Sequence, residues 1–340
     1  MNIEGLTAFL YKKDLVQSQS SELKITQYTN GYSNLTYLLQ IENKEFVLRR
    51  PPKGAVKRGH DMSREFKVLS NLQKEFDYAP KAILYCDDTT VIDSSFYLME
   101  KVDGIILTMK EAMKRQLPPS DFKTISNSWL TKFVALHNVN YKAAGLEDLG
   151  KPDGYVQRQV SNWGKQYLKA ATMDIPEAQK LMEWMELNQP KSYDHTFIHN
   201  DYKYDNVVFK DDSWQEITAI LDWEMCTLGD PLMDLGTSIA YWMTPEDGPA
   251  VKVLPSPTLL PGNPSRSEIV HQYALQSGRN VDNIVFYYAF GLFKVAVIAQ
   301  QIFYRFHKGL TDNEKFAKLD QACLMFCRMG WQAVQRNRIA

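Results

Sequence analysis

The segment HNDYKYDN, His199 to Asn206, places two aspartates and an asparagine in eight residues, directly after the apolar pair Phe197 and Ile198. An aspartate at a substrate hydroxyl can accept or orient its proton, and an amide with a second carboxylate can hold Mg²⁺, which prefers oxygen ligands. The run ITAILDWE carries such a carboxylate, Asp222. Because the stretches VVF and ITAILD flank a polar turn, KDDSWQ, we predict a hairpin that returns Asp222 to the neighbourhood of Asn206.

Aspartate is also common in turns and at strand ends, where it has no chemical role. We favour that interpretation for Asp205, which we predict to be structural. For Asp201, Asn206 and Asp222 together we favour chemistry, because the spacing HxDxxxxN before an apolar strand that ends in aspartate matches one known arrangement.

The segments HNDYKYDN and ILDWE resemble the catalytic loop and the metal-binding aspartate of the protein-kinase-like fold, specifically of the aminoglycoside phosphotransferase family. The run TLGDPLMDLG at 227–236 is also typical of the small-molecule kinases in that family. The resemblance implies Asp201 as the catalytic base and Asn206 and Asp222 as ligands of Mg²⁺. It also suggests Lys203 as a cation near the transferred phosphoryl group, with a solvated surface lysine as the alternative.

A kinase also needs a turn whose backbone N–H groups cover the phosphates of ATP. The stretch YTNGYSNLTY offers Gly31, Ser33 and Asn34 between two predicted strands. Asn-Gly is also the commonest hairpin turn, so this motif alone does not distinguish a nucleotide site from a simple hairpin.

The strand FVLRR aligns with the kinase pattern VAIK and places Arg49 where a lysine is usual. In the helix that we predict next, Glu65 shares the apolar stripe of Leu69, Leu72 and Phe76. A carboxylate on such a stripe is costly unless it is paired, so we predict an ion pair with Arg49 on the nucleotide side. A helix-surface position for Glu65 is the alternative. Arginine binds phosphate and carboxylate as well as lysine does, so the exchange does not argue against activity.

The segment FYLMEKVDG resembles the hinge between the two lobes of this fold. The resemblance implies that the Glu100 carbonyl and the Val102 N–H face the adenine edge, with Met99 behind it. A core strand followed by a turn describes the same residues, and both interpretations can hold together.

Several neighbouring residues are expected to support the loop without reacting. We expect His137 to be a core or interhelical histidine, and His199 to pack against the loop and hydrogen-bond it. We expect Asp230 and Asp234 to brace the loop through backbone hydrogen bonds. Asn200 stands where much of the family has glycine; asparagine tolerates unusual backbone angles, so we expect the loop to survive.

The elements that carry these motifs change character along the chain. Residues 1–100 contain strand-like stretches, a helix predicted over 61–76 and a last strand at 96–100. The proline-rich stretch 245–267 is predicted to be a surface loop or lid. Long helical periods are found at 121–139, 154–171, 176–189, 282–306 and 312–335.

The predicted fold is therefore α+β, a protein-kinase-like two-lobe fold. The nucleotide-binding lobe, 1–101, has a small antiparallel sheet and one key helix. The catalytic and substrate-binding lobe, 102–340, is larger and mainly helical.

The bulk composition restricts the partners. Lysine plus arginine (39) nearly balances aspartate plus glutamate (40), which gives a formal net charge of −1 and no indication of nucleic acid or an anionic membrane. The apolar stretch 286–304 is interrupted by Lys294, Gln300 and Gln301, so we predict a core helix and not a membrane span. The start resembles neither a signal nor an anchor, and the four cysteines lack metal spacing, so we expect a reducing, cytoplasmic setting.

These observations predict an ATP- and Mg²⁺-dependent kinase that transfers the γ-phosphoryl group to the hydroxyl of a small-molecule substrate. The motifs GYSNLTY, LRRPP and LDWEMCTLGDP are similar to those of the kinase-like domains fused to some acyl-CoA dehydrogenases, which implies a hydroxyacyl or hydroxyacyl-CoA acceptor. An amino alcohol, a sugar or an aminoglycoside is the alternative acceptor. A catalytically inactive pseudokinase and a two-metal hydrolase using Asp201, Asp205 and Asp222 are the alternative functions.

Overall fold

The computed structural model describes residues 2–28, 34–52, 61–252 and 254–339. The chain divides into two compact units. The first comprises residues 1–104, 141–146 and 218–225, and the second comprises residues 105–140, 147–217 and 226–340. We expected a single boundary between the two parts of the chain, after residue 101. The first unit instead also includes two later segments. One of these, 218–225, contains Asp222 and Glu224.

Local contacts explain why the segment 218–225 belongs to the first unit. The Ile220 N–H donates to the Tyr78 carbonyl at 2.6 Å, and the Trp223 ring packs edge-on against Phe76. The Trp223 indole N–H donates back to the Ile220 carbonyl at 2.8 Å. The contacts with Tyr78 and Phe76 join residues far apart in sequence, which no local pattern predicts.

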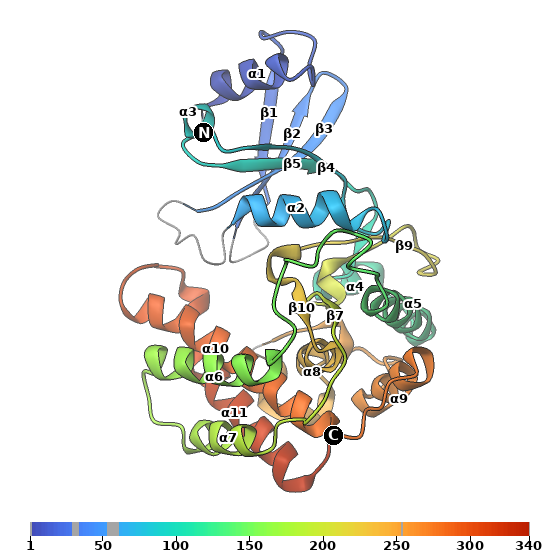
Figure 1. The fold of residues 1–340 in the computed structure, drawn as a ribbon, viewed down its shortest axis with the longest axis vertical. Helices are drawn as coiled ribbons and strands as arrows, with labels where there is room; N and C mark the ends of the chain where they lie inside the picture. Colours follow the sequence, from blue (N-terminus) through green and yellow to red (C-terminus); the bar gives the residue numbers. More distant parts are fainter. Residues whose placement is uncertain (1, 29–33, 53–60, 253, 340) are drawn as a thin grey trace. The chain divides into compact units, whose positions relative to one another are not determined.

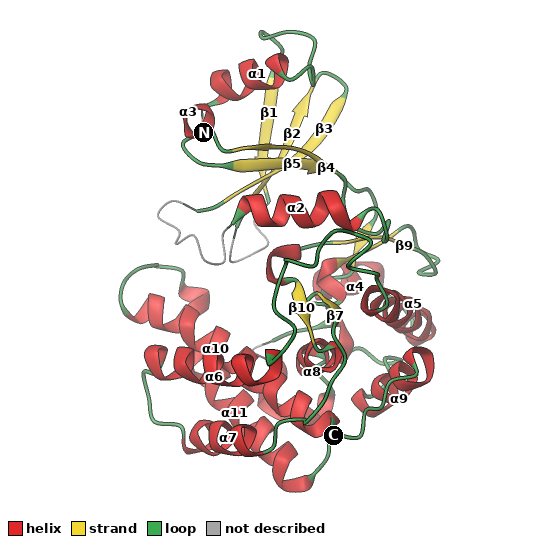
Figure 2. Cartoon of the chain, in the orientation of Figure 1, coloured by secondary structure: helices red, strands yellow, loops and turns green. Residues whose placement is uncertain are grey.

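The first unit is built on a five-stranded antiparallel sheet (Figure 1, Figure 2). A turn at Glu42 and Asn43 joins two of its strands, with Glu42 in the left-handed region at φ 53°. In spatial order the strands are β1 (Leu23–Gln27), β2 (Leu35–Ile41), β3 (Lys44–Arg50), β5 (Phe96–Glu100) and β4 (Ala82–Cys86). The small antiparallel sheet predicted from the sequence is confirmed.

Alternate side chains of β3 go to opposite faces of this sheet. Leu48 joins the apolar core together with residues of α1 (Ile3–Lys12) and α3 (Thr89–Ile92). Arg49 points to the other face, where it contacts α2 (Met62–Leu72). Figure 1 shows α2 running alongside β4 and β5.

The start of α2 is as predicted, but its end is not. The Asp61 side chain caps the helix by accepting hydrogen bonds from the N–H groups of Ser63 and Arg64, each at 3.1 Å. The helix ends at Leu72 and continues only as turns, so the predicted end near Phe76 is wrong.

The second unit is mainly helical, and the five helices predicted for it are confirmed. The shorter helices α4, α8 and α9 were not predicted. The helices are α4 (Met109–Arg115), α5 (Pro119–His137), α6 (Tyr155–Ala170), α7 (Pro176–Leu187), α8 (Pro231–Tyr241), α9 (Arg266–Ser277), α10 (Ile284–His307) and α11 (Leu319–Arg336).

Helix α8 lacks a helical period in the sequence because nearly all of its side chains are buried. Helix α8 crosses α10, and two glycines at the crossing allow the two backbones to approach each other closely. A Cβ on Gly236 would lie 2.2 Å from the Tyr287 carbonyl oxygen, and a Cβ on Gly291 would lie 2.2 Å from the Gly236 carbonyl oxygen. This crossing holds α8 against the centre of the unit.

Helix α10 is the central helix of the second unit and packs against α6, α7, α8 and α11. Its length and composition would allow it to cross a membrane, with a mean hydropathy of 1.4 over the most apolar window, but 78% of that window is buried inside the protein. The prediction of a core helix for this stretch is confirmed.

Short strands lie among these helices. β7 (Thr196–Ile198) pairs antiparallel with β10 (Thr227–Gly229), and β6 (Ile105–Ile106) pairs with β8 (Val207–Phe209). The predicted turn between β8 and β9 (Ile217–Ile220) is closed by the Lys210 N–H, which donates to the Glu216 carbonyl at 2.9 Å. The stretch 245–267 contains 3-10 turns at Pro245–Lys252 and Pro257–Leu259 and then the first residues of α9. Within it Thr258 is buried, so it is not a simple surface loop.

Candidate active site

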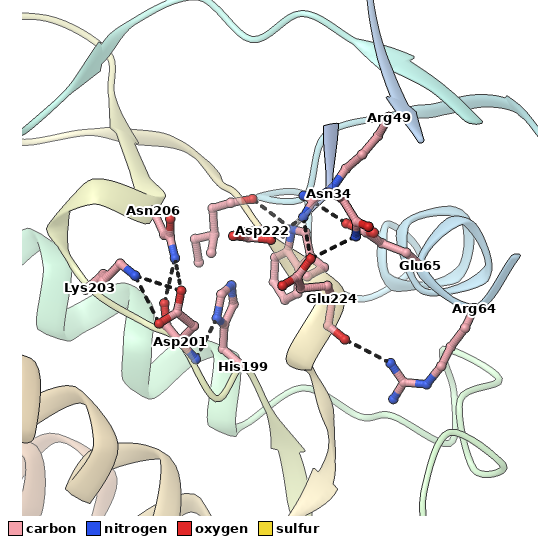
Figure 3. A network of polar contacts seen from close by, with 12 residues as sticks. Asn34, Arg49, Arg64, Glu65, His199, Asp201, Lys203, Asn206, Asp222 and Glu224 are labelled. Atoms are coloured by element: carbon pink, nitrogen blue, oxygen red, sulfur yellow. Dashed lines mark hydrogen bonds and ion pairs between the residues drawn. The ribbon is translucent and has the colours of Figure 1, made fainter. Parts of the chain in front are cut away.

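The loop after β7, residues 199–206, contains the predicted catalytic residue and is called the Asp201 loop below. The Asp201 carboxylate accepts hydrogen bonds from Lys203 Nζ at 2.8 and 3.1 Å and from Asn206 Nδ2 at 2.8 Å. Asn206 Nδ2 also donates to the Asp201 carbonyl at 2.8 Å. The 3-10 turn Tyr204–Asn206 brings the amide back to Asp201. Three predicted site residues are thus in contact within one loop (Figure 3).

Lys203 does not match the alternative of a solvated surface lysine. Its side chain is only 28% exposed, and its Nζ lies 4.9 Å from the centroid of the Tyr241 ring. Burial lowers the pKa of Lys203, but Asp201, Tyr241 and Asp205 together raise it more, so that the pKa lies above its ordinary value. The ammonium is therefore charged at neutral pH and remains beside the carboxylate.

Asp234 fixes the backbone just before Asp201. Its Oδ2 accepts a hydrogen bond from the His199 N–H at 2.6 Å, and its Oδ1 accepts one from the Asn200 N–H at 2.8 Å. The prediction that Asp234 braces the loop is confirmed. Asn200 lies in the left-handed region at φ 68°, which asparagine tolerates better than most residues.

The same prediction is wrong for Asp230. Its Oδ1 accepts a hydrogen bond from the Leu232 N–H at 2.8 Å, so it caps α8 instead. Burial raises the pKa of Asp230 to about 6, although hydrogen bonds from Tyr287 and Leu232 lower it.

A buried hydrogen-bond chain orients Asp234. His137 Nε2 lies 3.2 Å from Asp234 Oδ2, and His137 Nδ1 lies 2.7 Å from the Tyr273 hydroxyl. Burial lowers the pKa of His137 and favours its neutral form, in which Nε2–H donates to Asp234 and Nδ1 accepts from Tyr273. Burial raises the pKa of Asp234, but the His137 hydrogen bond, nearby charge and backbone N–H groups bring it below its ordinary value. The prediction of an interhelical histidine is confirmed.

His199 supports the loop from inside, as predicted. Its Nδ1 accepts a hydrogen bond from the Asp201 N–H at 3.2 Å, and its ring packs edge-on against Tyr202. Asp205 is exposed in the 3-10 turn, and its structural role stays a prediction.

A second cluster lies in the first unit around Arg49 (Figure 3). Arg49 Nη1 lies 3.1 Å from Glu65 Oε1, and Nη2 lies 2.6 Å from Asp222 Oδ1 and 2.8 Å from Glu224 Oε2. These four residues are called the Arg49 cluster. The predicted ion pair between Arg49 and Glu65 is present, and Glu65 is buried, so the surface alternative for Glu65 is wrong.

Within the Arg49 cluster, three carboxylates contact one guanidinium. Burial raises the pKa of Glu65 above its ordinary value, and Arg49 offsets only part of that shift. An anionic set of oxygen atoms suits a hard divalent cation. Within the described ranges, no group of three or more His, Cys, Asp or Glu residues is arranged to hold a metal ion.

The three residues predicted for the phosphate-covering turn have different outcomes. Gly31 and Ser33 lie outside the described residues. Asn34 is buried, and its Nδ2 donates to Glu224 Oε2 at 2.8 Å, so it contacts the Arg49 cluster.

The expected hinge begins at the end of β5. Met99 and Glu100 are its last residues, and both are partly buried. The Glu100 N–H donates to the Lys81 carbonyl at 2.9 Å. Val102 follows the strand in an irregular segment. Their adenine-binding role stays a prediction.

Sequence reasoning missed four residues of these networks. Glu224 contacts Arg49, and Tyr273 orients His137. Tyr155 and Lys294 contact Asn200, with 3.2 Å between the Tyr155 hydroxyl and Asn200 Nδ2 and 2.8 Å between Lys294 Nζ and the Asn200 carbonyl oxygen. Lys294 had a signal, since it is a lysine inside a long apolar stretch. The others had none that spacing could supply.

Comparison with known proteins agrees with this geometry. The human protein acyl-CoA dehydrogenase family member 11 is 37% identical over 300 residues, which cover 87% of this chain and 38% of the human protein. The chain thus spans less than half of that relative. A crystal structure assigned to an aminoglycoside phosphotransferase of Ralstonia eutropha is 29% identical, covers 98% of both chains and has a TM-score of 0.80.

An aminoglycoside phosphotransferase crystallised with ADP and hygromycin B shares the fold, with a TM-score of 0.60 at 14% identity over 96% of this chain and 98% of the other. The predicted protein-kinase-like fold is confirmed by these neighbours. Residues 24–255 match the phosphotransferase enzyme family APH. The match covers most of the chain and includes the Asp201 loop and the Arg49 cluster, so the chain belongs to the APH family of phosphotransferase enzymes.

Proposed function

We propose that the chain transfers the γ-phosphoryl group of ATP to a hydroxyl of a small molecule, and that Asp201 orients this hydroxyl and accepts its proton. The observation that carries the proposal is the Asp201 carboxylate in a loop fixed by backbone hydrogen bonds, with the Lys203 ammonium 2.8 Å away. Membership of the phosphotransferase family supports it. The hygromycin-bound neighbour, which binds ADP, supports a nucleotide as the phosphoryl donor.

Lys203 and Arg49 would offset the charge of the phosphates. Lys203 neutralises Asp201 in the free loop and can move its ammonium toward the oxygens of the transferred group. Arg49 would bind the phosphates on the nucleotide side, with Glu65 holding one edge of its guanidinium at 3.1 Å.

Asp222 and Asn206 are the residues that would hold Mg²⁺. Asn206 fits this task because its Nδ2 donates to Asp201, so its Oδ1 oxygen would serve as the ligand atom. Asp222 fits because its carboxylate is 35% exposed and offers the oxygen ligands that a divalent cation prefers. When bound, Mg²⁺ would neutralise charge on the phosphate oxygens.

The acceptor that we propose is a hydroxyacyl compound, such as a hydroxyacyl-CoA thioester. The second unit contains a cavity of about 390 Å³, and Asp247 in its lining is neutralised by Arg266, whose Nη1 lies 2.9 Å from Asp247 Oδ1. Arg336 and Arg338 add two positive charges to the lining and Glu246 adds one negative charge, so the lining keeps one net positive charge. This balance suits an anionic acceptor better than a polycationic drug, and the relationship to an acyl-CoA dehydrogenase family member supports the same class.

Helix α8 links this cavity to the Asp201 loop. Its last residue, Tyr241, lies against Lys203, and Thr244, shortly after the helix, lines the cavity. The lining residue Thr244 is thus three positions after Tyr241, the residue that contacts Lys203.

The test is ADP release with Mg-ATP across a panel of hydroxyacyl-CoA thioesters, amino alcohols, sugars and aminoglycosides. Asp201→Asn should lower kcat by about 10²–10⁴-fold with the best acceptor, because an amide cannot accept the proton. Asp205→Asn is the matched control in the same loop, and we expect kcat within about threefold of the unchanged protein.

Each other outcome contradicts one part of the proposal. Turnover that survives Asp201→Asn would exclude the mechanism. ATP binding without turnover on any acceptor would indicate a pseudokinase, and phosphate release from a phosphoester without ATP would indicate a hydrolase. Turnover only with aminoglycosides would leave the kinase chemistry standing and reject the acceptor class.

A further inference from the structure

Lys294 is a lysine in the interior of the second unit. It lies in the middle of α10 and is 2% exposed. Its Nζ donates to the Asn200 carbonyl at 2.8 Å and lies 5.8 Å from the centroid of the Trp163 ring. Among the residues that the structure describes, no carboxylate forms an ion pair with it.

A buried ammonium without a carboxylate partner is costly to stability. Most neighbours of Lys294 on α10 are apolar, and a methionine of similar length would fill the space without that cost. Packing therefore gives no reason for a charge at this position. The reason must lie in what the ammonium contacts.

The contact is with the peptide unit that leads directly into Asp201. The Asn200 carbonyl accepts from Lys294, and the N–H at the other end of the same peptide plane, that of Asp201, donates to His199 Nδ1 at 3.2 Å. The Asn200 N–H is held by Asp234 at 2.8 Å, and the Asn200 side chain is held by the Tyr155 hydroxyl at 3.2 Å. Because a peptide unit is planar, fixing its oxygen and its hydrogen fixes its rotation and hence the direction of the Asp201 side chain.

We infer that Lys294 is a positioning residue for Asp201: its ammonium holds the Asn200–Asp201 peptide plane, and its charge faces the carboxylates of the loop. This rests on the proposed phosphoryl transfer. Asp201 makes the contact with substrate, and Lys294 acts through the backbone.

The charge of Lys294 depends on pH in an accessible range. Burial lowers the pKa of Lys294 to about 8, while Asp234 of α8 and Asp201 raise it and Lys203 lowers it. Two further titratable groups near Asn200 are uncharged at this pH: the Tyr155 hydroxyl of α6, whose pKa burial raises, and His137 of α5, whose pKa burial lowers. We therefore expect kcat to fall as pH rises through about 8, because the neutral amine is a weaker donor than the ammonium.

The experiment compares Lys294→Met, Lys294→Arg and Gln300→Met with the unchanged full chain. Gln300 is the matched control, because it is buried on the same helix and donates to the Ala170 carbonyl at 2.9 Å, away from the loop. The measurements are kcat, KM for ATP, melting temperature, the pH profile of kcat, and hydrogen–deuterium exchange of a peptide that spans 196–206.

Lys294→Met is expected to lower kcat at pH 7 by about tenfold or more, with KM for ATP within about threefold and the melting temperature unchanged or raised. Its alkaline fall near pH 8 should disappear, and Lys294→Arg should restore kcat and move the fall to higher pH, since a guanidinium stays charged. Exchange in 196–206 should be faster in Lys294→Met. Gln300→Met should lower the melting temperature and leave kcat unchanged.

Three results would overturn the inference. The first is a kcat of Lys294→Met within about twofold of the unchanged protein. The others are a loss of kcat in Lys294→Met together with a loss of melting temperature as large as that of Gln300→Met, and unchanged exchange in 196–206. The exchange measurement needs no acceptor. If the unchanged protein shows no turnover on any acceptor, the proposed function fails, while faster exchange in Lys294→Met would still support the role of Lys294 in holding the loop.

Discussion

The Arg49 cluster and the Asp201 loop hold their functional groups in different ways. In the Arg49 cluster one guanidinium contacts three carboxylates from two separate stretches of chain, α2 and residues 218–225, at 2.6 to 3.1 Å. In the Asp201 loop the carboxylate contacts its own loop, and the supports behind it, Asp234 and Lys294, bind backbone atoms. The first region depends on net charge, and the second depends on the orientation of peptide units.

Because of this difference, the two regions respond differently to a change in geometry. A cluster of opposite charges adapts when a distance changes, because charge attraction falls slowly with separation. A peptide plane held by directed hydrogen bonds does not adapt, because these bonds weaken steeply with angle. We therefore expect changes in the Arg49 cluster to affect folding first, and changes behind the Asp201 loop to affect turnover first.

The largest effect is expected from Arg49→Met. It removes the cation that three carboxylates share and leaves the buried Glu65 uncompensated, so the free energy of unfolding should fall by about 3–5 kcal/mol in urea titration at neutral pH. Arg50→Met is the matched control, since Arg50 is the next residue on β3 and donates to the Ile92 carbonyl at 2.9 Å. We expect about 1 kcal/mol there, and equal losses in both variants would contradict the comparison.

Asp230 tests what a buried carboxylate does without a cation in contact. Its pKa is about 6 in the folded chain against an ordinary value of 3.8, so the folded state binds the proton more tightly than the unfolded state. The contribution of Asp230 to stability is therefore fully present below about pH 4 and is lost as pH rises through about 6, by about 3 kcal/mol. The difference in unfolding free energy between the unchanged protein and Asp230→Asn should show this fall. A difference that does not change with pH would reject it.

Asp234→Asn should affect turnover more than folding. Its carboxylate accepts from the N–H groups of His199 and Asn200, and an asparagine would turn a second donor toward one of them. Loss of one such charge-assisted bond corresponds to about 10–100-fold in kcat. Asp230→Asn is the control in the same helix, with kcat expected to remain within about twofold. The same loss of kcat in both variants would mean that α8 acts only as a packed helix.

The smallest effect is expected from Lys210→Met. Lys210 and Glu216 form an ion pair at 2.7 Å, as short as those of Arg49, but both side chains are more than half exposed. Exposed pairs contribute little, so the urea midpoint should not change measurably. A clear loss of stability would show that burial is not what distinguishes the Arg49 cluster.

The sequence was sufficient where a contact is local. Asp201, Lys203 and Asn206 lie within six residues, so their spacing alone predicted a shared loop. The Arg49–Glu65 pair was predictable because a carboxylate on an apolar stripe requires a partner, and the preceding strand offered one.

The rest depended on contacts across long sequence separations. Glu224 reaches Arg49 from 175 residues away, and Tyr273 reaches His137 from 136 residues away. Helix α8 escaped prediction because burial on all sides removes the polar face that defines a helical period. Asp230 and Asp234 belong to the same motif, TLGDPLMDLG, and the motif does not tell them apart. The direction of α8 decides that Asp234, and not Asp230, accepts hydrogen bonds from the Asp201 loop.

Asn200 also restricts the unfolded chain. A glycine would adopt the φ of 68° more easily, but it would give the unfolded chain more backbone freedom to lose on folding. Asparagine limits that freedom, and its contacts with Tyr155 offset the cost of about 1 kcal/mol for a left-handed backbone. The conformational entropy that this loop loses on folding is therefore smaller than the entropy lost by a glycine-containing loop with the same final shape.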